Sequence, residues 1–181
     1  MQQIAVVGSL QDAHKSLTLA EAFMSVEVLI LADHSGSMSA MDAGEGNRSR
    51  WDEANTQLAI LQRKYPGRLG LIAFSDYALF CPGGALPHVA GGTNMIAALE
   101  LVKPADGAGI RLIVVSDGCP NDPEGTLSLA RTFESSIDTI YIGTDPQGKT
   151  FMEALAKAGR GKSVTRGVSL LSESVVLLLE G

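Results

Sequence analysis

The sequence is poor in the residues that build disulfide frameworks and zinc sites. Its 181 residues include two cysteines, Cys81 and Cys119, which are too few for a disulfide-stapled scaffold. The three histidines, His14, His34 and His88, are scattered along the chain and have no spacing to a cysteine that is typical of zinc ligands. We therefore expect two free thiols in a reducing compartment.

Long apolar runs and an excess of positive charge are also missing. No stretch is long and apolar enough to cross a bilayer. The segment Met1 to Leu10 lacks the basic region followed by an apolar stretch that marks a secretory signal. The formal net charge is −6, whereas a protein that binds nucleic acid normally presents a net basic face. These absences argue against a membrane span, secretion and a nucleic-acid partner, and we expect a cytoplasmic protein.

What remains is the composition of a globular domain, 45% hydrophobic and 19% charged. Short apolar runs rich in branched residues alternate with helical patterns along the chain. The runs predicted to be buried strands are Val28–Leu31, Leu69–Phe74, Ile110–Val115 and Thr139–Ile142. The apolar residues that share a helical face are Trp51, Ala54, Leu58 and Leu61; Met95, Leu99 and Val102; Leu129 and Phe133; and Phe151, Ala154, Leu155 and Ala158. This alternation predicts an α/β fold with a doubly wound, mostly parallel sheet and helices on both faces.

Other segments complete this expected architecture. Residues 78–86 follow a strand too closely for a crossover helix, so we predict an antiparallel edge strand there. Residues 163–165 are predicted to be a further strand, and residues 169–179 a closing helix, part of which could also form a strand. Residues 1–26 are predicted to be an N-terminal extension packed on a single domain of residues 27–181.

Polar loops follow three successive elements of the predicted sheet. Residues 33–37 follow the first strand, residues 91–94 come after the edge strand, and residues 116–118 follow the strand at 110–115. Ligands of open α/β sheets bind beyond the carboxyl ends of the strands, so these loops bring two carboxylates and three hydroxyls to one edge. Such a hard oxygen set suits Mg²⁺ or Mn²⁺ better than zinc or copper. Because it supplies only two negative charges, a bound ion would need one further anionic oxygen from outside.

Each loop, taken singly, has a plainer interpretation. Asp33 and Ser35 could cap a following helix, Thr93 or Asn94 is a good N-cap for the helix that begins at residue 95, and Asp-Gly at 117–118 is a common turn pair. Capping, however, does not explain why all three loops follow successive sheet elements at the same edge.

The three loops together resemble a known metal site. Asp33-His34-Ser35-Gly36-Ser37-Met38, Gly91-Gly92-Thr93-Asn94 and Ser116-Asp117-Gly118 resemble the metal-ion-dependent adhesion site (MIDAS) of von Willebrand factor A (VWA) domains, with its pattern Asp-x-Ser-x-Ser, then Thr, then Asp-Gly. His34 occupies a variable position of the first motif and is given no role. Leu71 to Asp76 is similar to the second strand of the family, and the likeness in element order extends from Val26 to the C-terminus.

The resemblance implies a role for each site residue and a kind of partner. Ser35, Ser37 and Thr93 would bind Mg²⁺ or Mn²⁺ directly, whereas Asp33 and Asp117 would act mostly through bound water. A glutamate or aspartate of a partner protein would complete the coordination. The family likeness therefore implies a metal-dependent protein-binding module rather than an enzyme, for example an adaptor to an AAA+ ATPase or a stress-response complex.

Alternatives of other classes stay open at this stage. Residues 156–163 satisfy a relaxed P-loop pattern, but they end a predicted helix and lead into a strand, which is the reverse of a P-loop context. Gly159 and Gly161 are instead predicted to be helix C-cap glycines. A magnesium-dependent phosphatase-like hydrolase would need a second aspartate two residues after Asp33, where this chain has Ser35. A structural VWA domain with a non-functional metal site is the third possibility.

Overall fold

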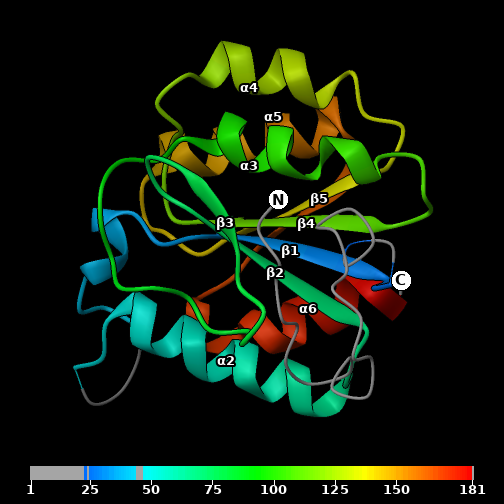
Figure 1. Ribbon diagram of the computed structural model, residues 1–181. Coiled ribbons are helices and arrows are strands. Elements are labelled where there is room, and N and C mark those ends of the chain that lie inside the picture. Colours follow the sequence, from blue (N-terminus) through cyan, green and yellow to red (C-terminus); the bar gives the residue numbers. More distant parts are fainter. Residues whose placement is uncertain (1–22, 24, 44–46, 181) are drawn as a thin grey trace.

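The computed structural model describes residues 23, 25–43 and 47–180, which fold as a central sheet between two layers of helices (Figure 1). The described residues form a six-stranded sheet in the order β3-β2-β1-β4-β5-β6. Its strands are β1 (Val28–Asp33), β2 (Leu69–Phe74), β3 (Ala78–Phe80), β4 (Arg111–Ser116), β5 (Ile137–Tyr141) and β6 (Arg160–Thr165). All neighbouring pairs are parallel except β2 with β3. The predicted fold class is therefore confirmed, including the antiparallel edge strand.

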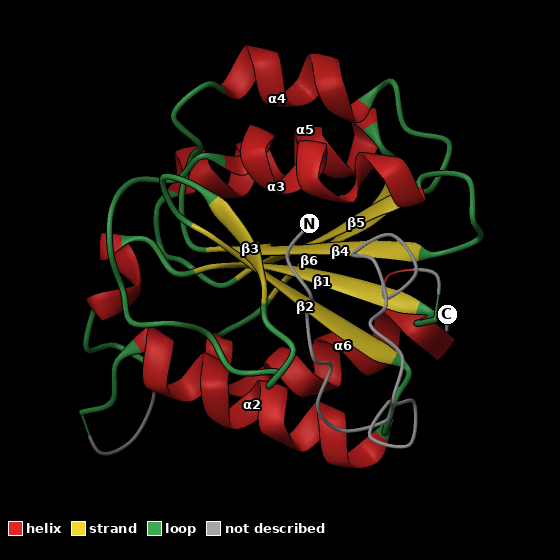
Figure 2. Cartoon of the chain, viewed as in Figure 1, coloured by secondary structure: helices red, strands yellow, loops and turns green. Residues whose placement is uncertain are grey.

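The helices cover both faces of this sheet. They are α2 (Arg50–Lys64), α3 (Met95–Val102), α4 (Pro123–Ala130), α5 (Pro146–Ala158) and α6 (Leu171–Glu180), with short 3₁₀ turns η1 (Gly36–Ser39), η2 (Lys103–Ala105) and η3 (Val168–Leu170). Helices α2 and α6 lie on one face, and α3, α4 and α5 lie on the other (Figure 2). The sheet is thus enclosed, which explains why its inner strands are continuous apolar runs rather than alternating patterns.

Strand β1 shows how the two faces are built from one sequence. Leu29 and Leu31 pack in the apolar core that contains the buried residues of α3 and α5. Val28 and Ile30, which alternate with them, pack in the second core with the buried residues of α2 and α6. Successive side chains of a strand point to opposite faces, so a fully apolar strand supplies both cores.

The edge strand is shorter than predicted. The sequence predicts a strand over residues 78–86, but β3 ends at Phe80. Pro82 has no backbone N–H to donate to a ladder, and Gly84 turns the chain with a positive φ of 67°. A Cβ at Gly84 would also collide with the side chain of Gln62, which donates a hydrogen bond to the Gly84 carbonyl over 2.7 Å. Leu86 is buried although it lies outside the strand.

Two predictions at helix ends also need correction. Phe133 is predicted to share a helical face with Leu129, but α4 ends at Ala130 and Phe133 is buried beyond it. Gly159 is the C-cap of α5, as predicted, whereas Gly161 lies inside β6 and caps nothing. An added Cβ at Gly161 would lie 2.1 Å from the carbonyl oxygen of Ile137, so the strand needs glycine there for close backbone approach.

The end of the described chain is helical. Residues 168–180 form η3 and α6, and Val175 is buried on α6, so the alternative of a strand in this segment is wrong. The predicted extension of residues 1–26 falls largely outside the described residues. None of the helices in the described part of the chain has the length and hydropathy needed to span a membrane.

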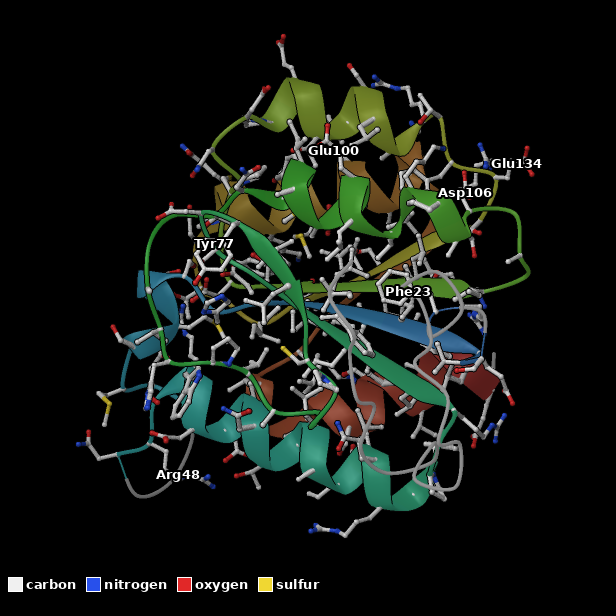
Figure 3. All side chains as sticks on the ribbon, in the orientation of Figure 1. Phe23, Arg48, Tyr77, Glu100, Asp106 and Glu134 are labelled. Carbon is white, nitrogen blue, oxygen red and sulfur yellow. The ribbon has the colours of Figure 1, made fainter. Side chains whose placement is uncertain are left out.

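The sheet order places a switch point at the end of β1. The chain leaves β1 to form β2 on one side and returns later to form β4 on the other. In open α/β sheets, ligands usually bind beyond the carboxyl ends of the two strands from which the connections diverge in this way. In Figure 3, Tyr77 and Arg48 project from loops at this edge, whereas Asp106 and Glu134 lie at the opposite edge. The loops after β1 and β4 therefore meet at the place where such folds bind ligands.

Candidate metal centre

Asp33 ends β1 and organises the loop that follows it. Its Oδ1 accepts a hydrogen bond from the backbone N–H of Ser35 over 2.7 Å, and its Oδ2 accepts one from the Ser116 hydroxyl over 2.7 Å. Only 1% of Asp33 is exposed. This burial raises the pKa of its carboxyl to about 6, although the hydrogen bonds from Ser35 and Ser116 oppose the rise. Asp33 thus ties the first loop to β4, with both carboxylate oxygens already engaged.

Two serines and the second aspartate form a chain of oxygen atoms in front of Asp33. The hydroxyl of Ser37 donates to Oδ1 of Asp117 over 2.7 Å, and the hydroxyl oxygens of Ser35 and Ser37 lie 3.0 Å apart. Ser35 is buried, whereas Ser37 in η1 is exposed. Four of the five predicted site residues are therefore linked directly, from the ends of two adjacent strands.

Thr93 reaches the same edge from the loop before α3. Its backbone N–H donates to Oδ1 of Asn121 over 3.0 Å, and its carbonyl accepts the N–H of Asn121 over 2.9 Å. The preceding Gly91 accepts a hydrogen bond from the N–H of Gly36 over 3.1 Å, which joins this loop to the serine loop. Gly91 has a φ of 68°, and a Cβ there would meet the carboxylate of Asp76 at 2.2 Å. The Thr93 loop is thus held beside the serine loop by backbone contacts that the motif pattern does not reveal, and the hydrogen bonds of the described residues do not link the Thr93 hydroxyl to the other four predicted site residues.

The side-chain oxygens at this edge are of the kind that hard divalent cations prefer. Oxygens on neighbouring vertices of an octahedron with 2.0–2.1 Å bonds are separated by about 2.9 Å, and the two serine hydroxyls are 3.0 Å apart. Among the described residues, no three His, Cys, Asp or Glu side chains gather to hold a metal. The donors at this edge are hydroxyls with two carboxylates, which agrees with Mg²⁺ or Mn²⁺ and not with zinc.

Arg50 is a functional candidate that the sequence analysis missed. It is the first residue of α2, and its Nη1 donates to Oδ2 of Asp117 over 2.8 Å. Its Nε and Nη2 donate to the two carboxylate oxygens of Asp42, with the Nε contact at 2.7 Å. The side chain of Asp117 is completely buried and that of Arg50 is 9% exposed. The second aspartate of the site therefore already has a cationic partner.

His34, which had no predicted role, anchors a neighbouring loop. It is 1% exposed, and its Nδ1 lies 3.0 Å from the carbonyl oxygen of His88, to which it donates. Its own carbonyl accepts the N–H of Ala90 over 3.0 Å. Trp51 stacks on the His88 ring and donates to the carbonyl of Pro87. These contacts hold the segment that leads into the Thr93 loop.

Solved structures with the same architecture include an aerotolerance-related membrane protein from Bacteroides fragilis, with a TM-score of 0.65 and 18% identity over 86% of this chain and 98% of that chain. The SpRpn10 VWA domain matches with a TM-score of 0.58 and 18% identity over 82% of this chain and 92% of that chain. This chain has the von Willebrand factor A fold. The manganese-loaded TRAP protein of Plasmodium vivax also matches the VWA fold seen here, with a TM-score of 0.60 and 19% identity over 86% of this chain and 72% of that chain. No family model matches the sequence, and no curated protein matches it.

Lys162 and Asp122, the first from the relaxed P-loop pattern and the second an acid that follows Asp117 by five positions, have structural contacts of their own. Lys162 is part of edge strand β6, and its backbone N–H donates to Asp138 over 2.8 Å, so the relaxed P-loop pattern runs from helix to strand as predicted. Asp122 caps α4 by accepting the N–H of Gly125 over 2.9 Å. Neither residue joins the oxygen cluster of the two serines.

Proposed function

We propose that this VWA domain is a metal-dependent protein-binding module. Ser35, Ser37 and Thr93 would bind one Mg²⁺ or Mn²⁺ ion, with Asp33 and Asp117 acting mostly through water. A glutamate or aspartate of a partner protein would complete the coordination. The bound ion would supply a positively charged attachment point for that carboxylate.

The observation that carries this proposal is the cluster of Asp33, Ser35, Ser37 and Asp117 at the switch point of the sheet. These residues are connected by hydrogen bonds of 2.7 to 3.0 Å, and the separation between the serine hydroxyls suits an octahedral ion. The TRAP protein, which has the same fold, was solved loaded with manganese, and this likeness supports the same interpretation. Simple helix capping does not account for the cluster, because Ser35 makes no side-chain cap to η1.

The engagement of the two carboxylates supports the need for an external acid. Both oxygens of Asp33 accept hydrogen bonds from the protein, so Asp33 is suited to orienting the loop rather than to direct coordination. The carboxylate of Asp117 forms an ion pair with Arg50. The direct ligands are therefore neutral hydroxyls, and a carboxylate from a partner would be favoured at the remaining position because charge-assisted contacts are stronger than neutral ones.

Titration calorimetry with MgCl₂ and MnCl₂ tests the metal site. We expect wild-type protein to bind one ion, and both Ser35→Ala and Thr93→Ala to weaken binding. Ser39→Ala is the matched control, because Ser39 lies in the same turn and its hydroxyl donates outward to the carbonyl of Gly36. Loss of ion binding in the control, or unchanged binding in both site variants, would contradict the assignment.

The acidic partner needs a separate experiment. Partners captured from extract in MgCl₂ should be released by chelator, and Thr93→Ala should weaken the partner more than it weakens the ion. A partner whose binding is altered neither by chelator nor by Thr93→Ala binds another face of the domain. We propose a reducing, cytoplasmic setting for this function, in which free thiols such as those of Cys81 and Cys119 persist. An AAA+ ATPase or stress-response complex is the kind of assembly to examine first.

We propose no enzymatic activity for the domain. A phosphatase-like hydrolase would need a second acid beside Asp33, and the nearby positions carry Ser35 and the Asp117–Arg50 pair. A structural domain with a non-functional metal site remains the outcome if wild-type protein binds neither magnesium nor manganese.

A further inference from the structure

Arg50 joins Asp117 of the candidate site to the carboxylate of Asp42, which lies outside the site. Its guanidinium lies between Asp117, which is completely buried, and Asp42, whose side chain is 44% exposed. Its Nη1 donates to Asp117, and its Nε and Nη2 donate to the two carboxylate oxygens of Asp42. The three groups are therefore a fixed, charged cluster with a net charge of about −1 by formal count.

The position of Arg50 in its helix is unfavourable by itself. Arg50 is the first residue of α2, at the positive end of the helix dipole, where a cation is disfavoured. The preceding Ser49 already caps the helix by accepting the N–H of Asp52 over 3.0 Å. Helix formation thus gives no reason for an arginine there, and the two carboxylates that it contacts do.

Arg50 also cannot act as the receptor for a partner. Only 9% of its side chain is exposed, and Nε, Nη1 and Nη2 all donate to carboxylates within the chain. Its charge instead acts inward, on Asp117 and on the oxygen cluster that Asp117 joins through Ser37.

We propose that Arg50 sets the cation affinity of the site: its fixed positive charge neutralises Asp117 and holds magnesium binding weak until an outside carboxylate adds its charge. This inference rests on the proposed metal site. In this arrangement, ion and acidic partner bind cooperatively, because each offsets the charge that disfavours the other.

Calorimetry with MgCl₂ alone on paired variants tests the proposal. Arg50→Gln removes the charge while its amide can still donate to Asp117, so we expect magnesium to bind about tenfold more tightly, equivalent to about 1.4 kcal/mol. Asp42→Asn leaves Arg50 less neutralised and should weaken magnesium binding about threefold, a smaller effect because Asp42 is partly solvated. Arg50→Lys keeps the charge and should not bind magnesium more tightly than wild type.

Arg68→Gln is the control for simple loss of a positive charge. Arg68 is 53% exposed and pairs with Glu27 at the amino end of the sheet, so its removal should leave magnesium binding unchanged. Circular dichroism and thermal unfolding would verify that each variant is folded.

The outcomes separate this proposal from the one on which it rests. If Arg50 only positions Asp117, then Arg50→Gln will bind magnesium more weakly than wild type or equally well, and the proposal is wrong. If Arg50→Gln does not fold, Asp42→Asn decides, because unchanged or tighter magnesium binding in that variant also overturns it. Wild-type protein that binds no magnesium would instead refute the metal site itself.

Discussion

Replacing Asp33 by asparagine should stabilise the metal-free domain while weakening ion binding at the candidate metal centre. Asp33 is buried at the end of β1, its carboxylate accepts hydrogen bonds from neutral groups, and burial raises the pKa of this carboxyl from 3.8 to about 6. The folded state therefore binds this proton more tightly than the unfolded state does. The free energy of unfolding falls as the pH rises from about 4 to about 6, and it stays lowered above that range.

The size of this effect follows from the pKa difference. One pKa unit corresponds to about 1.36 kcal/mol, so a carboxyl moved from 3.8 to about 6 destabilises the folded state at neutral pH by about 3 kcal/mol. The introduced asparagine would keep an oxygen to accept from the N–H of Ser35, and its amide group could donate to the Ser116 hydroxyl. Allowing for weaker hydrogen bonds than those of a carboxylate, we expect Asp33→Asn to add about 1–3 kcal/mol at pH 7, or about 3–10 °C in Tm for a chain of this size.

Urea unfolding of both proteins in chelator, at pH 4 and pH 7, measures this prediction. The gain should be present at pH 7 and should shrink towards pH 4, where Asp33 is protonated in the folded protein. Adding MgCl₂ at pH 7 should stabilise wild type more than Asp33→Asn, since a folded state is stabilised in proportion to how tightly it binds the ion. An equal or lower stability of Asp33→Asn at pH 7, or a gain of the same size at pH 4, would refute the reasoning.

Further predictions concern other parts of the domain. Hydrogen bonds from Lys103 and from two backbone N–H groups outweigh burial and lower the pKa of Asp106 to about 2. Asp106→Asn should therefore lower the free energy of unfolding by about 1–2 kcal/mol in urea at pH 7. This difference should disappear as the pH falls from about 4 to about 2. Leu99→Ala, at a fully buried position of α3, should cost about 2–5 kcal/mol. Asn121→Ala should weaken magnesium binding in calorimetry, because Asn121 holds Thr93 in place; unchanged affinity would remove it from the site. The protein should release no phosphate from ATP or phosphate monoesters in a colorimetric assay, and turnover lost with Lys162→Ala would contradict this.

Local patterns in the sequence were sufficient to predict the order of the strands and helices. The apolar run at Leu69–Phe74 forms β2 with the predicted limits, because a strand buried on both faces needs apolar residues throughout. The stripe of Ala54, Leu58 and Leu61 is buried on α2, because residues three and four apart share a helix face. The order of strands and helices then brought the loops of Asp33 and Asp117 to one edge.

Element limits were less predictable where a local contact decided them. Strand β3 stops at Phe80 because Pro82 and Gly84 turn the chain, and the sequence alone did not show which apolar residues after the turn stay in the ladder. Gly161 resembles a helix cap in sequence, yet it lies in β6 against the carbonyl of Ile137. That close approach depends on how β5 and β6 pair.

Only the tertiary structure decided the charge of the site. Arg50 and Asp117 are 67 positions apart, and Thr93 and Asn121 are 28 apart, so no local pattern joins them. Arg50 meets Asp117 because α2 begins beside the carboxyl end of β4, a placement set by how the helix packs on the sheet. The sequence by itself determined which side-chain oxygens the loops carry to this edge. The packing of α2 determined how much negative charge they offer, because electrostatic interactions depend on distance in space and not on separation along the chain.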